Sequence, residues 1–480
     1  MLKQRLSTGV SGLDEVLYGG LLPNRAYLIR GGPGAGKTTL GLHFLAVGVA
    51  ESERSLYITL GESPEQIRAN ANSVGIDAES MNFLDLSPNT EFFTQVQTYD
   101  IFSPAEVERE PTTKRIIDEV EAIKPQRVFL DAVTQFRYLS NDNFLFRKQV
   151  LSFIRFLLSQ GATVMFSSEG TDNTPDDDLQ FISDGVIHLN QSLIGRSICV
   201  TKFRGSDFQH SFHSMRLTKI GMEVFPRLQP EAHRKDFVAQ SIPSGVPELD
   251  QMLHGGLERG TVTLVTGATG VGKTTLGLQF MKEAASRGER SVIYTFEEAA
   301  DTLLLRSESV NIPVHVMKQQ GTLSIVEVEP LRLTPDEFAR LVRHEVEVRQ
   351  ARIVMLDSIA GYRVSLQGED LVRHLYALCK YLQNMGVTVL LINETEHITG
   401  EFCATEMGIS HLADNIVFLR YMEIHSQMRK AIGVLKKRLS DFEKTLREIE
   451  ITRHGIKVSQ PLHSLRHIFS GTPEWIGNDK

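Results

Sequence analysis

Two glycine-rich stretches of the sequence have the pattern GxxxxGK[ST], which is typical of a phosphate-binding loop. They are GGPGAGKT at residues 31–38 and GATGVGKT at residues 267–274. Each follows a short apolar run and opens a stretch of helix-forming composition, which is the context that the motif requires. Glycines let successive backbone N–H groups surround the β- and γ-phosphates of a nucleotide, and the N-terminus of the following helix adds partial positive charge. The sequence therefore predicts two ATP sites, each with Mg²⁺.

Individual side chains of both loops have predicted roles. Lys37 and Lys273 neutralise phosphate oxygens, and the hydroxyls of Thr38 and Thr274 are predicted metal ligands. The predicted ATP-binding residues of the first loop are Gly31, Gly32, Pro33, Gly34, Ala35, Gly36, Lys37, Thr38 and Thr39. Those of the second loop are Gly267, Ala268, Thr269, Gly270, Val271, Gly272, Lys273, Thr274 and Thr275.

An aspartate follows another buried apolar run in each half of the chain. RVFLDAV at residues 127–133 carries Asp131, and IVMLDSI at residues 353–359 carries Asp357. Many buried strands end on an aspartate, so the pattern is weak when it stands alone. Its occurrence downstream of both phosphate loops favours a functional role, in which the carboxylate holds a metal-bound water.

Acidic residues follow a further strand-like run in the second half and are only partly matched in the first. At a constant offset of 236 residues, Gly61 stands opposite Glu297, and Glu62 stands opposite Glu298. A carboxylate at this place can accept a proton from the attacking water, or orient it, and Glu297 is also predicted to contact the metal. The alternative is an acidic pair that caps the next helix. We expect the strand that carries the pair to lie beside the phosphate-loop strand.

The chain consists of two copies of one module. GVSGLDEVLYGGL at residues 9–21 matches GVPELDQMLHGGL at residues 245–257. Strand-like and helix-like stretches alternate in each copy, which predicts an α/β fold with a mainly parallel sheet flanked by helices. We place the domains at residues 1–233 and 234–480, with a linker at about 226–243.

Composition limits the class of protein. The 480 residues are 41% apolar and 23% charged, with a net charge of −8, which are ordinary values for a globular chain. The three cysteines are far apart, so neither a structural zinc site nor a disulfide framework is expected. No apolar run has the length of a membrane span. We expect a cytoplasmic protein that does not bind a membrane, and nucleic acid is an unlikely partner for an acidic chain.

These motifs together resemble the KaiC family within the RecA-like P-loop ATPases. The resemblance rests on the doubled lead-in, both phosphate loops, the EE after the second strand and the closing KxRxS segments. It implies two tandem RecA-like domains, a homohexamer of two stacked rings with ATP between neighbouring subunits, and the glutamate pair as the source of the catalytic base. Glu62, Glu297 and Glu298 match that pair, whereas Gly61 departs from it. The first ring is therefore expected to bind ATP but to hydrolyse it slowly.

The resemblance also implies basic residues that act on the neighbouring subunit's site. The matching segments are TKFRGSDF at residues 201–208 and LKKRLSDF at residues 435–442. Alternate residues of a strand point the same way, so the two cations of each segment share a face. The predicted trans-acting residues are Lys202, Arg204, Lys436 and Arg438. The alternative for these segments is an ordinary solvated edge strand.

Clock-type members of the family phosphorylate themselves on an adjacent Ser–Thr pair. The matching stretch here is GISHLADNIVFL at residues 408–419, in which Ser410 falls on the serine and His411 on the threonine. Ser410 is thus a candidate phosphoacceptor of a serine/threonine autokinase, whereas His411 cannot replace a threonine. A two-site phosphorylation cycle in its usual form is not expected.

Two other functions compete with an ATP-hydrolysing, KaiC-like signalling hexamer that works with a KaiB-like or other signalling partner. The first is a DNA-dependent ATPase of the RecA, RadA or DnaB kind, which shares the same core. Against it, neither half shows a basic, aromatic-rich loop that would stack bases. The second is a scaffold in which bound ATP serves mainly to hold the oligomer together.

Overall fold

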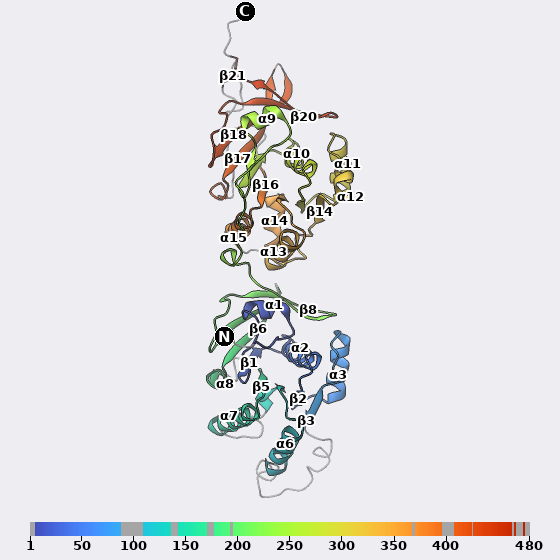
Figure 1. Ribbon diagram of the computed structural model, residues 1–480, viewed down its shortest axis with the longest axis vertical. Helices are drawn as coiled ribbons and strands as arrows, with labels where there is room; N and C mark the ends of the chain where they lie inside the picture. The colour runs from blue at the N-terminus through green and yellow to red at the C-terminus, as the bar shows by residue number, and fades with distance from the viewer. Residues whose placement is uncertain are drawn as a thin grey trace, which may run out of the picture. The chain divides into compact units, whose positions relative to one another are not determined.

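The computed structural model describes residues 5–87, 109–135, 143–169, 177–192, 195–366, 370–395, 408–424, 426–462, 465–466 and 474–475. The chain forms two compact units, Met1–Arg227 and Leu228–Lys480. Each unit is a nine-stranded sheet with helices around it (Figure 1). Both are built to one plan, as the internal repeat predicts.

The elements of the first unit, in chain order, are α1 (Ser11–Val16), β1 (Ala26–Gly31), α2 (Lys37–Ala50), β2 (Ser55–Thr59), α3 (Pro64–Ser73), β3 (Asn82–Asp85), α6 (Arg109–Ile123), β4 (Arg127–Asp131), α7 (Asn143–Ser159), β5 (Thr163–Ser168), α8 (Asp177–Ile182), β6 (Gly185–Gln191), β7 (Arg196–Phe203), β8 (His213–Thr218) and β9 (Gly221–Phe225).

The elements of the second unit are η2 (Pro230–Ala232), β10 (Ser241–Ile242), α9 (Pro247–Met252), β11 (Leu257–Glu258), β12 (Val262–Gly267), α10 (Lys273–Ser286), β13 (Ser291–Thr295), α11 (Ala300–Glu308), α12 (Val314–Gln319), β14 (Leu323–Glu327), α13 (Pro335–Arg343), η3 (His344–Val348), β15 (Ile353–Asp357), α14 (Ile359–Ser365), α15 (Leu371–Asn384), β16 (Thr388–Glu394), β17 (Asn415–Ile424), β18 (Gln427–Lys437), β19 (Arg447–Thr452), β20 (Gly455–Pro461), β21 (Leu465–Arg466) and β22 (Glu474–Trp475).

The strand order is the same in both sheets. In the first unit it runs β3-β2-β4-β5-β1-β6-β7-β8-β9, and in the second β14-β13-β15-β16-β12-β17-β18-β19-β20. The strands from β3 to β6 are mutually parallel, and β7 to β9 continue the sheet antiparallel. In a parallel sheet the loops at the carboxyl ends of the strands gather along one edge, which is where such folds bind ligands. The phosphate loop follows β1 or β12 at this edge.

One predicted neighbour relationship is wrong. The strand that carries the second-half glutamates, β13, does not lie beside the phosphate-loop strand β12, because β15 and β16 come between them. Instead β13 pairs with β15, so that Thr295 lies opposite Asp357. The first unit repeats this arrangement, with Thr59 opposite Asp131. The strand that carries the glutamates therefore lies beside the strand that ends on Asp357 and not beside the phosphate-loop strand.

Helices cover both faces of each sheet, so the strands are continuous apolar runs rather than alternating ones. In the first unit, one face of the sheet packs against α2 through residues such as Tyr27, Phe44 and Phe129. The other face packs against α6 and α7 through Val120 and Ile154. The second unit has the same two cores, one that includes α10 and one that includes α13 and α15. Packing on both faces holds the strands in place, and with them the loops at their carboxyl ends.

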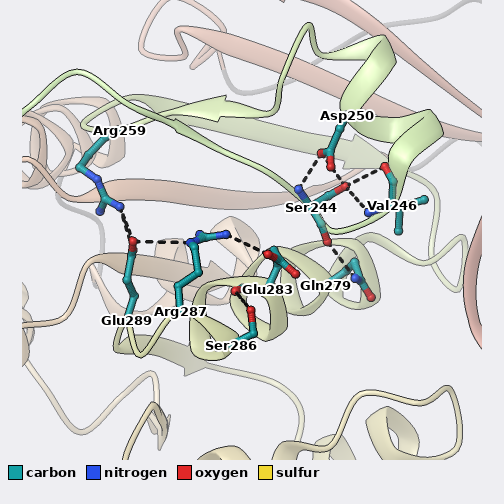
Figure 2. A network of polar contacts seen from close by, with 9 residues as sticks. All are labelled: Ser244, Val246, Asp250, Arg259, Gln279, Glu283, Ser286, Arg287 and Glu289. Carbon is teal, nitrogen blue, oxygen red and sulfur yellow. Dashed lines mark hydrogen bonds and ion pairs between the residues drawn. The ribbon is translucent and has the colours of Figure 1, made fainter.

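The segment before α9 is tied to the helix that follows the second phosphate loop (Figure 2). Asp250 Oδ1 accepts hydrogen bonds from the backbone N–H of Ser244, at 2.6 Å, and from its hydroxyl, at 2.8 Å. Gln279 on α10 donates a 2.8 Å hydrogen bond to the Ser244 carbonyl. In the first unit, Thr8 and Asp14 repeat the serine–aspartate contacts. The shared aspartate of the doubled lead-in thus has a structural role in both halves.

Candidate nucleotide-binding and hydrolysis sites

Both predicted phosphate loops connect a central strand to the N-terminus of a helix. Gly31 ends β1 and Lys37 begins α2, while Gly267 ends β12 and Lys273 begins α10. The helix N-cap is a glycine in the left-handed conformation in both, with φ 105° at Gly36 and φ 115° in the second loop. A residue with a side chain would be strained there. The backbone N–H groups at these helix ends are free to face an anion, as a phosphate site requires.

The two loop lysines are buried and bent back on their own loops. Lys37 Nζ donates hydrogen bonds of 2.8 Å and 3.0 Å to the carbonyls of Gly31 and Gly32, and Lys273 Nζ donates one of 2.8 Å to Ala268. Burial lowers the pKa of both ammonium groups, and nearby carboxylates partly offset this effect. Phosphate oxygens entering the loop would offer the ammonium groups acceptors with full negative charge.

Each loop threonine is joined to the predicted strand-end aspartate. Thr38 Oγ1 donates a 2.7 Å hydrogen bond to Asp131 Oδ2, and Thr274 Oγ1 donates one of the same length to Asp357 Oδ2. The partners are 93 and 83 residues apart in the chain. Two independent copies of the repeat thus bring a hydroxyl and a carboxylate together at the carboxyl edge of the sheet.

This pair of oxygen ligands fits Mg²⁺, which takes one or two carboxylates and hydroxyls from the protein and completes its shell with phosphates and water. Among the described residues, no group of three or more His, Cys, Asp or Glu side chains could hold a metal by itself. A metal held by this pair would need further ligands, which nucleotide phosphates and water could supply. When bound, the metal would neutralise charge on the β- and γ-phosphates.

The aspartates differ in what else surrounds them. Asp131 also accepts a 2.8 Å hydrogen bond from the Tyr57 hydroxyl and a hydrogen bond from Ser167. The register of the second sheet places Ile293 and Ile392 at these two positions. Burial raises the pKa of Asp357, and the hydrogen bond from Thr274 lowers it in part. The second-domain carboxylate therefore stands in the more apolar environment.

The glutamates of the second domain have separate partners. Glu297 is exposed, and its Oε1 accepts a 2.8 Å hydrogen bond from Ser358, the residue after Asp357. Its charge also acts on Lys273. Glu298 instead forms a 2.9 Å ion pair with Arg306 on α11. Glu297 is the one directed toward the strand-end aspartate and the loop lysine, so it is the better placed proton acceptor.

Glu62 has no such position in the first domain. Its carboxylate is exposed and lies 3.5 Å from the Asn70 amide of α3. Its backbone is held by Thr59, whose hydroxyl donates to the Glu62 carbonyl at 2.7 Å, in the same way that Thr295 holds Glu298. Glu62 is therefore the structural counterpart of Glu298, the glutamate that pairs with an arginine, and not of Glu297.

The predicted trans-acting cations lie away from their own phosphate loop. Lys202 is opposite Val186 on β6, which is opposite Leu28 of β1, and its ammonium group bonds to the carbonyls of Gln180 and Ser183 before β6. Arg204 follows β7 and is exposed. Val186 and Leu28 are near the amino ends of their strands, and each strand residue adds about 3.3 Å along the strand. Lys202 and Arg204 therefore lie toward the amino edge of the parallel strands, whereas the loop is at the carboxyl edge.

The second domain repeats this placement. Lys436 Nζ donates a 2.6 Å hydrogen bond to the Ala413 carbonyl before β17, and Arg438 forms a 3.0 Å ion pair with Asp414. Asp414 also accepts a 3.0 Å hydrogen bond from the backbone of Val262, at the amino end of β12. These cations face away from the ATP site of their own domain.

Ser410 lies in the short turn before β17. Its side chain is half-buried, and its carbonyl lies 3.4 Å from Lys436 Nζ. His411 is exposed, and its Nδ1 lies 2.8 Å from the Gly408 carbonyl. Ser410 is therefore at the amino edge of the sheet, with the basic residues and away from the phosphate loop of its own domain.

Sequence reasoning missed two repeated features of the sites. Arg196 and Lys430, on equivalent positions of β7 and β18, donate hydrogen bonds of 3.4 Å and 3.1 Å to the carbonyls of Gly34 and Gly270 in the phosphate loops. The acidic residues Glu169, just after β5, and Glu394, the last residue of β16, stand at the ends of the strands next to the loop strands, and their charges act on the loop lysines. An alignment of the two halves through the strand ends would have found both features.

A mainly parallel sheet, a phosphate loop after a central strand and a strand-end aspartate bound to the loop threonine define a RecA-like P-loop ATPase domain, present twice. The family model described as "ATPase: KaiC" matches residues 6–229 and again 242–463. The chain belongs to the KaiC ATPase family. No described helix is long and apolar enough to span a membrane.

Relatives of full length resemble the chain at low identity. It is 28% identical to the circadian clock oscillator protein KaiC of Parasynechococcus marenigrum (strain WH8102), over 100% of this chain and 95% of the relative. It is 27% identical to the KaiC proteins of Acaryochloris marina (strain MBIC 11017) and Synechococcus elongatus (strain ATCC 33912 / PCC 7942 / FACHB-805). These alignments cover 99% of this chain in both cases, and 92% and 93% of the relatives.

Proposed function

We propose that the protein is a double-ring homohexamer that binds Mg-ATP in both domains and hydrolyses it mainly in the second, as the engine of a signalling or regulatory function. The observation that carries this proposal is the set formed by Thr274, Asp357 and Glu297. It brings a hydroxyl and a carboxylate that suit a metal ion, and a second carboxylate that suits a proton acceptor, to one edge of the sheet.

In the second domain these residues have complementary tasks. Lys273 and the backbone of the loop bind the phosphates, while Asp357 and Thr274 hold Mg²⁺ and its water. Glu297, oriented by Ser358, accepts the proton of the attacking water as the new P–O bond forms and the bond to the β-phosphate oxygen breaks. Burial of Asp357 strengthens its attraction for a cation, because a charge in an apolar environment is poorly solvated.

The position of the basic residues supports a ring. Lys202, Arg204, Lys436 and Arg438 lie toward the sheet edge opposite their own phosphate loop, and a phosphate within their reach would have to belong to another subunit. Cations that reach the γ-phosphate stabilise the charge of the transferring group. The hexameric state itself follows from the family resemblance.

Two measurements test this function. Phosphate release from purified protein with Mg-ATP should be measurable and should not increase when single-stranded DNA is added, whereas stimulation by DNA would favour the RecA, RadA or DnaB alternative. Light scattering should give a hexamer with ATP or a non-hydrolysable analogue and smaller species after nucleotide removal, because a ligand bound between subunits stabilises their contact by mass action. A monomer at saturating nucleotide would exclude the ring.

A serine/threonine autokinase activity is the second function that we propose, and it is supported by the placement of Ser410. The turn that carries Ser410 lies at the same sheet edge as Lys436 and Arg438. In a ring that brings these cations to a neighbour's ATP, Ser410 would approach the same γ-phosphate. Phosphopeptide mapping after incubation with Mg-ATP tests this activity, and an unmodified Ser410 would leave ATP hydrolysis as the only chemistry. A KaiB-like or other signalling partner and a cytoplasmic location belong to this proposal as well.

A further inference from the structure

At two equivalent positions, one after each of two neighbouring strands, both domains have one glycine and one long polar side chain. The position that holds the glycine in one domain holds the polar residue in the other. In the first domain, Gly61 stands where the second has Glu297, and Gln135 stands four residues after Asp131. In the second domain, Gly361 stands four residues after Asp357. Each domain therefore has one glycine and one side chain with a terminal carbonyl-type oxygen, contributed from opposite sides of the pair β2–β4 or β13–β15.

Both glycines lie where an added Cβ would meet a neighbouring side chain. A Cβ on Gly61 would come within 3.0 Å of Gln135 Nε2, closer than real Cβ contacts occur. A Cβ on Gly361 would come equally close to Phe296 Cβ, and would lie 3.3 Å from Glu297 Oε1. Gly61 has no left-handed φ, so backbone conformation does not demand a glycine there. Instead, the end of the Gln135 side chain occupies the space that a Cβ at this position would fill.

We propose that Gln135 replaces Glu297 in the first domain and orients the attacking water with an uncharged amide. The proposal rests on the proposed ATP hydrolysis. Gln135 is held on the turn that follows Asp131, since its backbone N–H donates a 3.1 Å hydrogen bond to the Ala132 carbonyl. This turn comes directly after Asp131, whose carboxylate accepts the hydrogen bond from Thr38, so Gln135 follows the predicted metal site closely in the chain. Glutamine is a known type of water-positioning residue in phosphoryl transfer.

The chemistry of the two sites differs in the fate of one proton. In both, the water oxygen forms a bond to the γ-phosphorus while the bond to the β-phosphate oxygen breaks. In the second domain, the Glu297 carboxylate accepts the water proton and later releases it to solvent. The Gln135 amide can accept a hydrogen bond from the water but cannot take its proton, which passes instead to the departing phosphate. The first domain should therefore be slower, yet active.

The test uses the full chain with Glu297→Gln and Glu298→Gln, so that phosphate release reports the first domain. Adding Gln135→Ala to this background should lower the remaining turnover at least about tenfold, because a pre-oriented polar group is lost, while binding of a fluorescent ATP analogue is retained. The matched control is Gln126→Ala, which removes an exposed glutamine beside the other end of β4 and should change neither quantity.

Gln135→Glu in the same background separates water positioning from a structural role. A carboxylate there should raise turnover, and the ratio of its rate to that of the background should fall as the pH is lowered and the carboxylate becomes protonated. Gly61→Glu with Gln135→Gly, which places the glutamate and the glycine as in the second domain but without a counterpart of Ser358, should show the same acid sensitivity.

Three results would overturn the proposal: no phosphate release from the background, an unchanged rate in Gln135→Ala, or a rate ratio for Gln135→Glu that does not depend on pH. If the unmodified chain bound no ATP analogue in either domain, the proposed ATPase function itself would be contradicted. That result is distinct from a failure of the proposal for Gln135.

Discussion

Ser358 donates a 2.8 Å hydrogen bond to Glu297 Oε1, which connects the residue after the strand-end aspartate to the predicted proton acceptor. The Ser358 hydroxyl also accepts a 3.2 Å hydrogen bond from the backbone N–H of Gly361 and so caps α14. The equivalent residue of the first domain is Ala132, which can do neither. The second domain thus has a support for its glutamate that the first domain lacks.

Ser358→Ala should therefore lower the turnover of ATP without abolishing binding. Loss of the cap should also cost about 0.5–2 kcal/mol of unfolding free energy, which thermal unfolding would measure. Ser358→Thr keeps a hydroxyl and should restore most of the rate. If alanine and threonine variants had equal rates, the hydrogen bond to Glu297 would have no part in catalysis.

The glutamates should contribute very unequally to hydrolysis. Glu297→Gln with Glu298→Gln should remove most of the steady-state phosphate release, because general-base assistance is worth about 10²–10⁴ in rate. Glu62→Gln should remove little, since Glu62 is exposed and contacts Asn70 rather than the metal-site residues. Release is to be measured at saturating Mg-ATP. A loss in Glu62→Gln as large as that in the double variant would make Glu62 a competent base.

Lys37→Ala and Lys273→Ala should have different main effects. Both remove an ammonium group from a phosphate loop, and each should weaken ATP binding by its own domain. If the first ring mainly binds ATP, Lys37→Ala should chiefly reduce assembly, and Lys273→Ala should chiefly reduce hydrolysis. Light scattering and phosphate release on the same samples separate the two effects. An intact hexamer without hydrolysis in Lys37→Ala would contradict this division of tasks.

Much of the fold could be predicted from the sequence, because each motif and each strand-like or helix-like pattern occurs in both halves of the chain. The apolar runs that carry Asp131 and Asp357 are the strands β4 and β15, and both phosphate loops join a strand to a helix. The order of strands could not be predicted. Local periodicity specifies that a segment is a buried parallel strand, but the neighbour of that strand is decided by crossover connections and by packing across the whole sheet. The position expected for β13 was wrong for this reason.

Site residues that belong to one loop could be predicted from the sequence. Contacts between residues of loops that are far apart in the chain could not. The phosphate loops are contiguous motifs, so their residues follow from the pattern alone. The relation between Gly61 and Gln135 joins segments that are far apart in the chain, and its counterpart in the second domain has the two residue types reversed. A register taken from the phosphate loops does not extend to Gln135, because the offset between the halves changes before Asp131 and Asp357.

Asp357→Asn should show that the second-domain carboxylate is kept for function at a cost in stability. Burial raises the pKa of Asp357 above its ordinary value, with the Thr274 hydrogen bond only partly opposing this. A carboxyl group with a higher pKa in the folded state binds its proton more tightly when folded, so stability falls as the pH rises from the unfolded to the folded pKa. Above this range the ionised carboxylate destabilises the nucleotide-free fold.

The asparagine variant should therefore unfold at a higher temperature than the unmodified protein at neutral pH without nucleotide, and this difference should shrink as the pH is lowered. Its phosphate release and its stabilisation by Mg-ATP should both decrease, because an amide does not replace a carboxylate as a magnesium ligand. Asp236→Asn, at an exposed aspartate in the segment before β10, is the matched control and should change none of these quantities. Lower thermal stability of Asp357→Asn at neutral pH would show that the buried carboxylate stabilises the empty site, contrary to the direction of its pKa.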